Sequence, residues 1–326
     1  MSDFLRISGA EALPAHLRGA VVAIGNFDGV HRGHQTVLLR ALEIAREHNR
    51  PAVVLTFEPN PRSVFQPDVP LFRLTPAPMK AKVLDLLGYD AVVEQKFDRD
   101  FAAIPREVFE TEILAEKLGA GCIVTGYDFH YGKARGGTSQ TLKEAGQRLG
   151  FNVCIVDAFT DEGGEVISSS RIRKLLAGSS VAEAAGLLGY RFTVEAEVTH
   201  GKKLGRTLGF PTANMVLSGD VELAHGIYAV RLRRPDGTVH DGVANFGKRP
   251  TVDSDGEPLL ETYVFDFEGD LYGEVCSVSL FGFLRPELKF DGLDALVVQM
   301  KQDEAEARAL LSGMRPLSQL DLDLTF

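Results

Sequence analysis

The sequence predicts two domains, an α/β domain with a doubly wound parallel sheet and a C-terminal antiparallel β-barrel with a closing helix. A chain of 326 residues is long enough for two separate hydrophobic cores. In its first half, short apolar runs alternate with helical stretches, which is typical of a doubly wound parallel sheet. After about residue 188, runs of alternating polarity are separated by turn sequences, which indicates antiparallel strands.

Short apolar runs predict the strands of the first domain. The expected strands are Val21–Ile24 and residues 53–57, 91–93, 122–125 and 153–156. Helices are expected between them, for example over residues 79–87 and 108–118. These elements predict a parallel sheet of about five strands, with its ligand beyond the carboxyl ends of the strands.

The second half predicts a small barrel followed by one long helix. The expected strands are residues 192–198, 227–232, 239–243, 262–267 and 275–281. The helix is expected from about Leu293 to Leu311, with an apolar stripe that should pack on the barrel: Leu293, Leu296, Val297, Met300, Ala307 and Leu310. Small residues between positions 177 and 189 mark the junction, which predicts domains over 1–187 and 188–326.

Composition excludes several classes of protein. The chain is 44% hydrophobic and 25% charged, as in ordinary globular proteins. Its net charge of −10 and isoelectric point near 5.4 disfavour a nucleic-acid partner. No segment resembles a membrane span or a secretory signal, so we expect no membrane partner and a cytoplasmic location. We also expect a monomer or weak homo-oligomer. Cys122, Cys154 and Cys276 lie in apolar runs without metal-ligand spacing, which indicates core residues.

The segment over residues 23–35 carries the strongest chemical signal. An apolar strand leads into a glycine-rich turn, and His31 and His34 follow as a helix begins. Backbone N–H groups and the positive end of the helix dipole suit phosphate groups there. The imidazoles add donors that can become cationic as charge builds on a leaving phosphate.

Two other interpretations of the histidine pair stay open. Side chains three apart on a helix could form half of a metal site, although no Cys or carboxylate partner stands nearby. They could also be ordinary surface residues. The glycines at 25, 29 and 33 favour a ligand site, because they permit tight turning and close approach to the backbone.

Five motifs in order resemble the prokaryotic bifunctional riboflavin kinase/FAD synthetase family. They are residues 27–34 (FDGVHRGH), 126–129 (GYDF), 167–173 (ISSSRIR), 205–214 (GRTLGFPTAN) and 266–273 (DFEGDLYG). The resemblance covers nearly the whole chain. It implies an N-terminal nucleotidyltransferase-like FMN adenylyltransferase domain and a C-terminal riboflavin kinase barrel. The expected reactions convert riboflavin and ATP to FMN and ADP, then FMN and ATP to FAD and pyrophosphate.

The resemblance also implies roles for individual residues. His31, His34 and Arg173 would act in adenylyl transfer, and Glu261 would be the base for the ribityl 5′-hydroxyl. Thr212 and Asn214 would hold Mg²⁺. The implied ATP-binding residues are Gly25, Asn26, Phe27, Asp28, Ser168, Ser169, Ser170, Gly201, Lys202, Gly205 and Arg206. The implied flavin-binding residues are Asn60, Asp128, Phe283, Arg285 and Glu287.

The residues themselves support parts of this assignment. Serines 168–170 can cap a helix while they hold phosphates, although an ordinary helix cap would look the same. Thr212 and Asn214 supply hard oxygen ligands on one side of an extended segment. By strand period, Glu261 shares a face with Tyr263 and Phe265, which we expect to point inward and so to raise the pKa of the carboxyl group. An exposed strand-edge glutamate is the alternative.

This chain departs from the family pattern at four positions. Ser170 stands where the family usually has Thr, Tyr131 where it has Phe, Asn60 where His is frequent, and Tyr263 where many relatives carry His.

The sequence leaves two rival functions open. One is an adenylyltransferase for another phosphorylated substrate, with the barrel as a flavin sensor. The other is a flavin carrier without catalytic activity.

Overall fold

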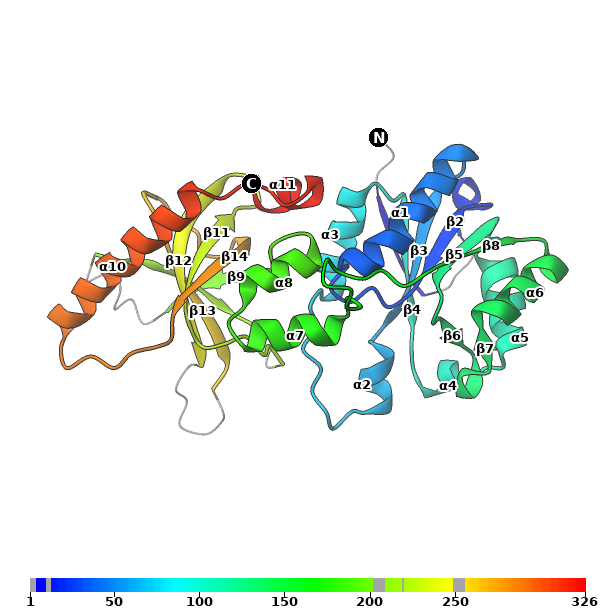
Figure 1. Ribbon diagram of the computed structural model, residues 1–326, viewed down its shortest axis with the longest axis horizontal. Coiled ribbons are helices and arrows are strands. Elements are labelled where there is room, and N and C mark those ends of the chain that lie inside the picture. The colour runs from blue at the N-terminus through cyan, green and yellow to red at the C-terminus, as the bar shows by residue number, and fades with distance from the viewer. Residues whose placement is uncertain (1–3, 10–12, 202–208, 219, 249–255) are drawn as a thin grey trace. The chain divides into compact units, whose positions relative to one another are not determined.

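The computed structural model describes residues 4–9, 13–201, 209–218, 220–248 and 256–326. Its chain divides into two compact units, Met1–Ser168 and Ser169–Phe326. The first is an α/β unit and the second contains a closed barrel (Figure 1). Both halves of the predicted fold class are confirmed. Within the described residues, no helix is long and apolar enough to cross a membrane.

The first unit is built on a six-stranded parallel sheet. Its strand order is β1-β4-β3-β2-β5-β8. These strands are β1 (Leu5–Ser8), β2 (Val21–Ile24), β3 (Ala52–Glu58), β4 (Ala91–Lys96), β5 (Cys122–Gly126) and β8 (Asn152–Val156). The central strands β2 and β3 are almost continuously buried, because helices cover both faces of a parallel sheet.

Helices and short elements connect these strands. The α-helices are α1 (Arg32–Glu47), α2 (Pro61–Phe65), α3 (Ala77–Leu87), α4 (Arg99–Ala102), α5 (Arg106–Val108) and α6 (Ser139–Leu149). A π-helix spans Phe109–Lys117, and the two-stranded ribbon consists of β6 (His130–Tyr131) and β7 (Gly137–Thr138). Short 3-10 turns lie at Ala15–Leu17 and Lys133–Arg135. The helix expected over residues 108–118 is therefore mostly a π-helix.

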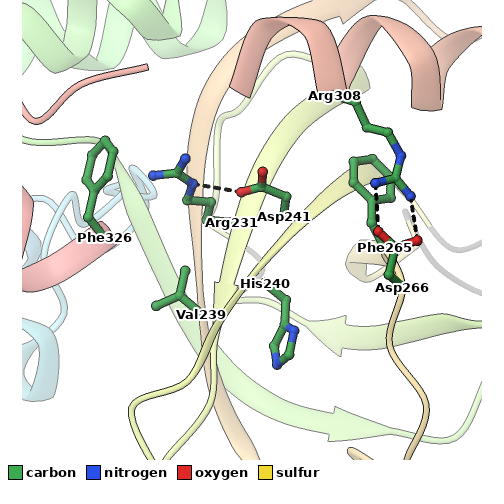
Figure 2. Close-up of a pocket in the computed structure, with 8 residues that line it drawn as sticks. All are labelled: Arg231, Val239, His240, Asp241, Phe265, Asp266, Arg308 and Phe326. Atoms are coloured by element: carbon green, nitrogen blue, oxygen red, sulfur yellow. Dashed lines mark hydrogen bonds and ion pairs between the residues drawn. The ribbon is translucent and has the colours of Figure 1, made fainter. Parts of the chain in front are cut away.

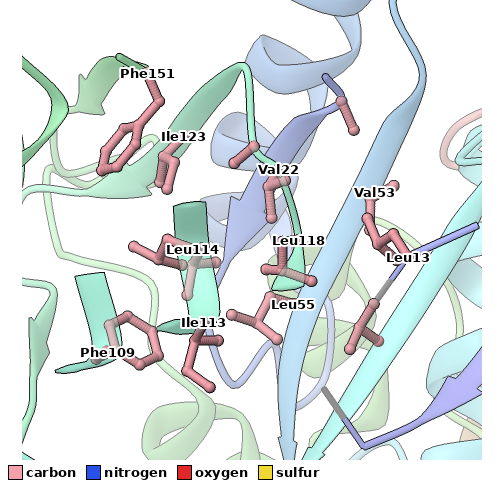
Figure 3. Close-up of a cluster of buried hydrophobic side chains, with 14 of the residues drawn as sticks. Leu13, Val22, Val53, Leu55, Phe109, Ile113, Leu114, Leu118, Ile123 and Phe151 are labelled. Atoms are coloured by element: carbon pink, nitrogen blue, oxygen red, sulfur yellow. The ribbon is translucent and has the colours of Figure 1, made fainter. Parts of the chain in front are cut away.

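One face of the sheet packs on the π-helix and α6 to form the main core of this unit (Figure 3). Val22, Leu55 and Ile123 come from neighbouring strands, and Phe109 and Leu114 come from the π-helix. Helix α1 packs on the other face, against β2 and β5. The sheet therefore lies between two packed layers, and the β2–α1 loop follows one of its central strands.

The hydroxyl of Tyr131, one of the departures from the family pattern, has a defined partner. It donates a 2.7 Å hydrogen bond to Glu110 Oε1, and Arg148 pairs with the other carboxylate oxygen at 2.7 Å. Glu110 is buried, so both contacts compensate for its loss of water. Burial raises the pKa of the Tyr131 phenol, which stays protonated as a donor. Tyrosine at this position is thus a structural substitution.

The second unit is a closed six-stranded antiparallel barrel with flanking helices. Its strand order is β10-β13-β12-β11-β14-β9. The strands are β9 (Thr193–Thr199), β10 (Thr212–Val216), β11 (Gly226–Arg233), β12 (Val239–Lys248), β13 (Pro258–Val264) and β14 (Val275–Arg285). The helices are α7 (Ser169–Ala177), α8 (Val181–Leu188), α10 (Leu293–Ser312) and α11 (Gln319–Thr325). Barrel closure pairs every edge, so the register of each strand is determined.

The barrel buries one side of each strand in its interior, and helices cover part of the outer side. On β13, Leu260, Thr262 and Val264 are buried, whereas the alternate residues Glu261 and Tyr263 are partly exposed. Part of the outer face packs on α10, where Ala307 and Leu311 meet Phe265. The expected inward orientation of Glu261 and its aromatic neighbours is therefore wrong.

The closing helix α10 packs on the barrel through a smaller face than the sequence predicted. Its buried residues are Asp303, Ala307 and Leu311, which are spaced four apart. The predicted stripe included Leu293, which is 56% exposed. The first half of the helix extends beyond the core that its second half covers.

The cysteines match the sequence-based interpretation. Cys122 and Cys276 are buried and Cys154 is half-buried, all three as free thiols. Burial raises the pKa of Cys276 to about 11, and the nearby Glu274 adds to the effect. Cys276 is therefore a packed thiol at neutral pH, and a thiolate nucleophile is not favoured there.

Candidate active sites

The loop between β2 and α1 carries the predicted phosphate site, and its backbone has an uncommon conformation. Phe27 and Val30 have φ angles of 47° and 37°. Such left-handed values are strained for bulky and β-branched residues, so surrounding contacts have to hold the loop. A Cβ atom at Gly25 would lie 2.9 Å from the Phe27 ring, so this position requires glycine.

The two predicted histidines lie together at the start of α1. Nδ1 of His31 accepts a hydrogen bond from the His34 backbone N–H at 3.2 Å, which makes His31 the N-cap of the helix. Their rings stack with centroids 3.6 Å apart, and the Phe27 ring meets His34 edge-on at 5.4 Å. Because Nδ1 of His31 accepts this bond, the neutral ring carries its proton on Nε2 and can donate it to a phosphate oxygen.

His34 is held in its neutral form. Burial lowers the pKa of His34 well below its usual range, and His31 and Lys80 lower it further. Its Nδ1 is buried without a hydrogen-bond partner among the described residues. A positive charge on this ring at pH 7 would therefore have to be induced by a bound phosphate. Over the whole described part of the chain, no group of three or more His, Cys, Asp or Glu side chains is arranged to hold a metal ion.

A buried ammonium group supports this loop. Lys80, on α3, is 1% exposed. Its Nζ donates to the backbone oxygen of Asn26 at 3.0 Å and to Thr56 Oγ1 at 2.9 Å. The third contact is with Glu58 Oε1 at 2.9 Å. All three ammonium protons therefore have acceptors, and one acceptor belongs to the predicted nucleotide loop.

Glu58 joins this ammonium to an arginine. Arg73 forms a two-pronged pair with the Glu58 carboxylate, with nitrogen-to-oxygen distances of 3.0 and 2.8 Å. Burial alone would raise the pKa of Glu58, but Arg73 and Lys80 hold it below its usual range. Arg73 Nε also lies 3.7 Å from Asp28 Oδ1. Two cations and two carboxylates thus balance, so the network positions the loop without adding net charge to it.

Thr75 closes the same network from the neighbouring segment. Its backbone N–H donates to Asp28 Oδ1 at 3.1 Å, and its hydroxyl accepts from the Gly29 N–H at 2.8 Å. The predicted ATP-binding residue Asp28 is therefore a buried loop anchor as well. Sequence reasoning did not identify Lys80, Arg73 or Thr75. Lys80 could have been found in the sequence as a lysine among the apolar residues of the helix predicted over residues 79–87.

The other predicted residues of the first site follow neighbouring strands. Asn60 follows β3, where it caps α2 by accepting from the Arg62 N–H at 3.0 Å. Asp128 follows β5 and is exposed. Because β3 and β5 both flank β2, these residues lie at the same carboxyl edge of the sheet as the histidine loop.

The serine-rich segment crosses the limit between the two units. Ser168 ends the first unit, whereas Ser169, Ser170 and Arg173 lie on α7 of the second. Helix α7 begins at Ser169, as the serine triplet predicted. The phosphate-binding roles of these residues stay predictions.

In the barrel, the predicted metal ligands lie on one strand and one face. Nδ2 of Asn214 donates to the Thr212 backbone oxygen at 3.0 Å, which leaves Oδ1 of Asn214 as an acceptor. A Cβ atom at Gly201 would lie 2.6 Å from that Oδ1, so glycine allows the backbone to approach the amide. A hydroxyl and an amide oxygen on one face are a donor set that fits Mg²⁺. The predicted ATP-binding residues Lys202, Gly205 and Arg206 lie outside the described residues.

The strand register brings the predicted base to the predicted metal ligands. Asn214 on β10 pairs directly with Glu261 on β13, and Thr212 pairs with Tyr263. Side chains of directly paired residues share a face, with Cβ atoms about 5 Å apart. Thr212, Asn214 and Glu261 therefore meet on the outer face of the barrel.

The predicted flavin-binding segment after β14 has three separate contacts. Phe283 packs against the buried Tyr228 ring at 5.2 Å. Arg285 pairs with Asp303 of α10 through nitrogen-to-oxygen distances of 2.7 and 2.6 Å. Glu287 reaches β12, where a Cβ atom at Gly247 would lie 2.7 Å from its Oε1. Arg285 thus holds the closing helix, and Glu287 lies over the barrel wall.

A cavity of about 500 Å³ lies elsewhere on the second unit (Figure 2). It is lined by Arg231, Val239, His240, Asp241, Phe265, Asp266, Arg308 and Phe326. Arg231 pairs with Asp241 and Arg308 with Asp266, each at 2.8 Å. None of the predicted site residues lines this cavity. Both guanidinium groups that line it therefore already have carboxylate partners.

Comparison with known proteins shows the family of this chain. A family model described as FAD synthetase matches residues 13–171, and one described as riboflavin kinase matches residues 188–311. The bifunctional riboflavin kinase/FMN adenylyltransferase of Escherichia coli K12 is 40% identical over 91% of this chain and 95% of its own. The chain belongs to this bifunctional family. A Listeria monocytogenes member is 37% identical over 90% of this chain and 93% of its own.

A solved structure supports the family assignment at the level of the fold. A Streptococcus pneumoniae protein, described there as a macrolide-efflux protein, aligns with a TM-score of 0.82 and 32% identity. The alignment covers 94% of this chain and 98% of that chain. That protein therefore matches the fold of this chain over both units.

The Lys80 network predicts a selective effect on FMN adenylylation. We expect Lys80→Met to lower the rate of FAD formation from FMN roughly 10²-fold, because the loop loses its anchor at the Asn26 carbonyl. Riboflavin phosphorylation by the same chain should be unchanged. Lys82→Met, two residues along α3, is the matched control. Unaltered FAD formation in the Lys80 variant would show that the loop needs no such anchor.

Two variants separate the helix-capping role of His31 from the proposed catalytic role of the histidines. His31→Asn retains a capping oxygen but removes the imidazole, and His34→Ala removes the stacked ring. Each should cost on the order of 3 kcal/mol in transition-state stabilisation of FMN adenylylation. Steady-state rates for both reactions provide the measurement. Equal losses of adenylylation and riboflavin phosphorylation would indicate misfolding instead.

Proposed function

We propose that the two activities of this riboflavin kinase and FMN adenylyltransferase are carried by separate domains, residues 1–187 and 188–326. Adenylyl transfer is assigned to the histidine loop, and riboflavin phosphorylation to the outer face of the barrel. The observation that carries the proposal is the direct strand pairing of Asn214 with Glu261, which places a proposed Mg²⁺ ligand beside a candidate base. In the first unit, a braced loop holds two stacked histidines at a helix N-terminus.

Adenylyl transfer requires positioning and charge stabilisation. An oxygen of the FMN phosphate attacks the α-phosphorus of ATP, and the bond to pyrophosphate breaks. Donors that face the leaving group accelerate this step. We assign this role to Nε2–H of His31 at the start of α1, where the ring of His34 stacks on His31. We assign the additional positive charge to Arg173, with Ser168, Ser169 and Ser170 as phosphate contacts.

Phosphorylation of riboflavin requires a base and a positioned nucleotide. Glu261 accepts the proton of the ribityl 5′-hydroxyl. The hydroxyl oxygen of riboflavin attacks the γ-phosphorus of ATP, and ADP leaves. Oδ1 of Asn214 and the hydroxyl of Thr212 would hold Mg²⁺. When bound, this ion neutralises the charge of the ATP phosphates. The Gly201 backbone lies against the Asn214 amide, which holds that ligand in place.

Other parts of the proposal follow from sequence and position. Asn60 and Asp128 would contact FMN at the edge of the sheet, and Phe283, Arg285 and Glu287 would contact riboflavin near the barrel. A cytoplasmic location and a monomeric or weakly associated state stay predictions. The two rival functions are not favoured, because family models match the chain on both sides of the domain limit.

Glu261→Gln tests the assigned base with little change in size. Riboflavin phosphorylation should fall roughly 10²- to 10⁴-fold, because no carboxylate remains to accept the proton. Riboflavin affinity should change little, and FAD formation from supplied FMN should persist. Both rates are measured by chromatographic separation of the flavins. A kinase rate within a few-fold of wild type would refute the role of Glu261 as base.

A fragment experiment tests the separation of activities. A fragment of residues 188–326 should make FMN, because all the predicted riboflavin kinase residues lie in it. It should make no FAD, because it lacks the predicted adenylyltransferase residues. A second fragment of residues 169–326 retains α8, which packs on β14, and should unfold at a higher temperature. The measurements are kinase activity and thermal unfolding. A folded 169–326 fragment without kinase activity would show that the barrel site needs the first domain.

A further inference from the structure

A polar row crosses the outer face of the barrel beyond the residues already assigned. Glu261 on β13 pairs with Asn214 on one side and with Asn245 of β12 on the other. Directly paired residues share a face, so these three side chains stand next to one another. Asn245 thus lies beside the proposed base, on the side opposite the proposed metal ligands.

The Asn245 amide has an unused acceptor. Its Oδ1 is buried without a hydrogen-bond partner among the described residues. Most buried polar atoms in proteins are hydrogen-bonded, because an unpaired one costs about 1–3 kcal/mol. Thr262, adjacent to Glu261, also has an unpaired buried oxygen, but it faces the barrel interior. Asn245 differs because its face is the one that carries the candidate site.

The place of Asn245 in the barrel suggests what would pair with this oxygen. Two residues farther along β12 and on the same face, Gly247 lies under the Glu287 carboxylate. Ile227 of β11 pairs with both Asn245 and Arg285. Asn245 therefore lies between the proposed base and the proposed flavin-binding segment. In riboflavin, the hydroxylated ribityl chain joins the 5′-hydroxyl to the ring.

We propose that Asn245 binds the ribityl chain of riboflavin, with its Oδ1 accepting a hydrogen bond from one inner hydroxyl group. This contact selects a hydroxylated chain and sets the terminal 5′-hydroxyl against Glu261. A polar group that is paired only when substrate is bound discriminates strongly against analogues that lack the matching hydroxyl. The inference rests on the proposed placement of the kinase site on this face.

The test is a cycle of variants and substrate analogues in the full-length enzyme. Asn245→Ala should raise the KM for riboflavin roughly tenfold or more, with a smaller change in kcat. The substrates are riboflavin and its 2′-, 3′- and 4′-deoxy analogues, all of which retain the 5′-hydroxyl. With the analogue that lacks the hydroxyl bonded by Asn245, wild type and Asn245→Ala should have equal kcat/KM, because neither enzyme can form that hydrogen bond.

Matched variants separate binding from folding. Thr262→Val removes the other unpaired oxygen and should leave the KM for riboflavin unchanged. Asn245→Ala should unfold at a temperature no lower than wild type, because its unpaired oxygen stabilises nothing in the free protein. FAD formation from FMN should stay at the wild-type rate in both variants. A uniform rise in KM for every analogue, or an equal rise in Thr262→Val, would overturn the proposal.

The same experiment distinguishes this inference from the placement of the base. Riboflavin binding is measured directly by quenching of its fluorescence in Asn245→Ala and in Glu261→Gln. The ribityl contact is supported if riboflavin binds more weakly to Asn245→Ala but not to Glu261→Gln, and if one deoxy analogue abolishes the effect of Asn245→Ala. That result stands even if Glu261→Gln keeps its kinase rate and the base assignment fails. Unchanged binding in Asn245→Ala overturns the contact while a slow Glu261→Gln enzyme still supports the base.

Discussion

The contact between the buried Lys80 ammonium and the Asn26 carbonyl is the interaction on which the first site depends. Removing a charged group from water is costly unless it is fully paired, and Lys80 has three acceptors. One of them, Glu58, is itself held by Arg73. The sheet and α3 thus keep a strained loop in one conformation, and that conformation places His31 at the start of α1.

Strand register has the corresponding role in the barrel. Side chains alternate between the two faces of a strand, so a slip of one residue in β10 or β13 would separate Asn214 from Glu261. Closure of the sheet prevents such a slip, because every strand is paired on both sides. Neither residue needs a helix or loop to bring it to the other. The paired strands alone therefore keep these two groups aligned.

Local sequence was a good guide where structure follows from neighbouring residues. The glycine-rich turn, the helix start at His31 and the strands β2 and β5 all follow from patterns within a few residues. It failed where long-range packing decides. Strand β1 has only four residues at the edge of the sheet and too weak a pattern to be recognised. Glu261 was assigned to the wrong face because Phe265, beyond the end of β13, packs under α10 rather than inside the barrel.

The sequence by itself determined the two-part architecture, the strand-turn-helix with its histidines, and the family. Those features reside in hydrophobic periodicity and in motifs that are contiguous along the chain. Tertiary structure alone decided which distant residues meet. Lys80 lies 54 positions from Asn26, and Asn214, Asn245 and Glu261 come from three strands. Their contacts depend on strand order, register and helix packing, which arise from the energy of the whole fold rather than from any short segment.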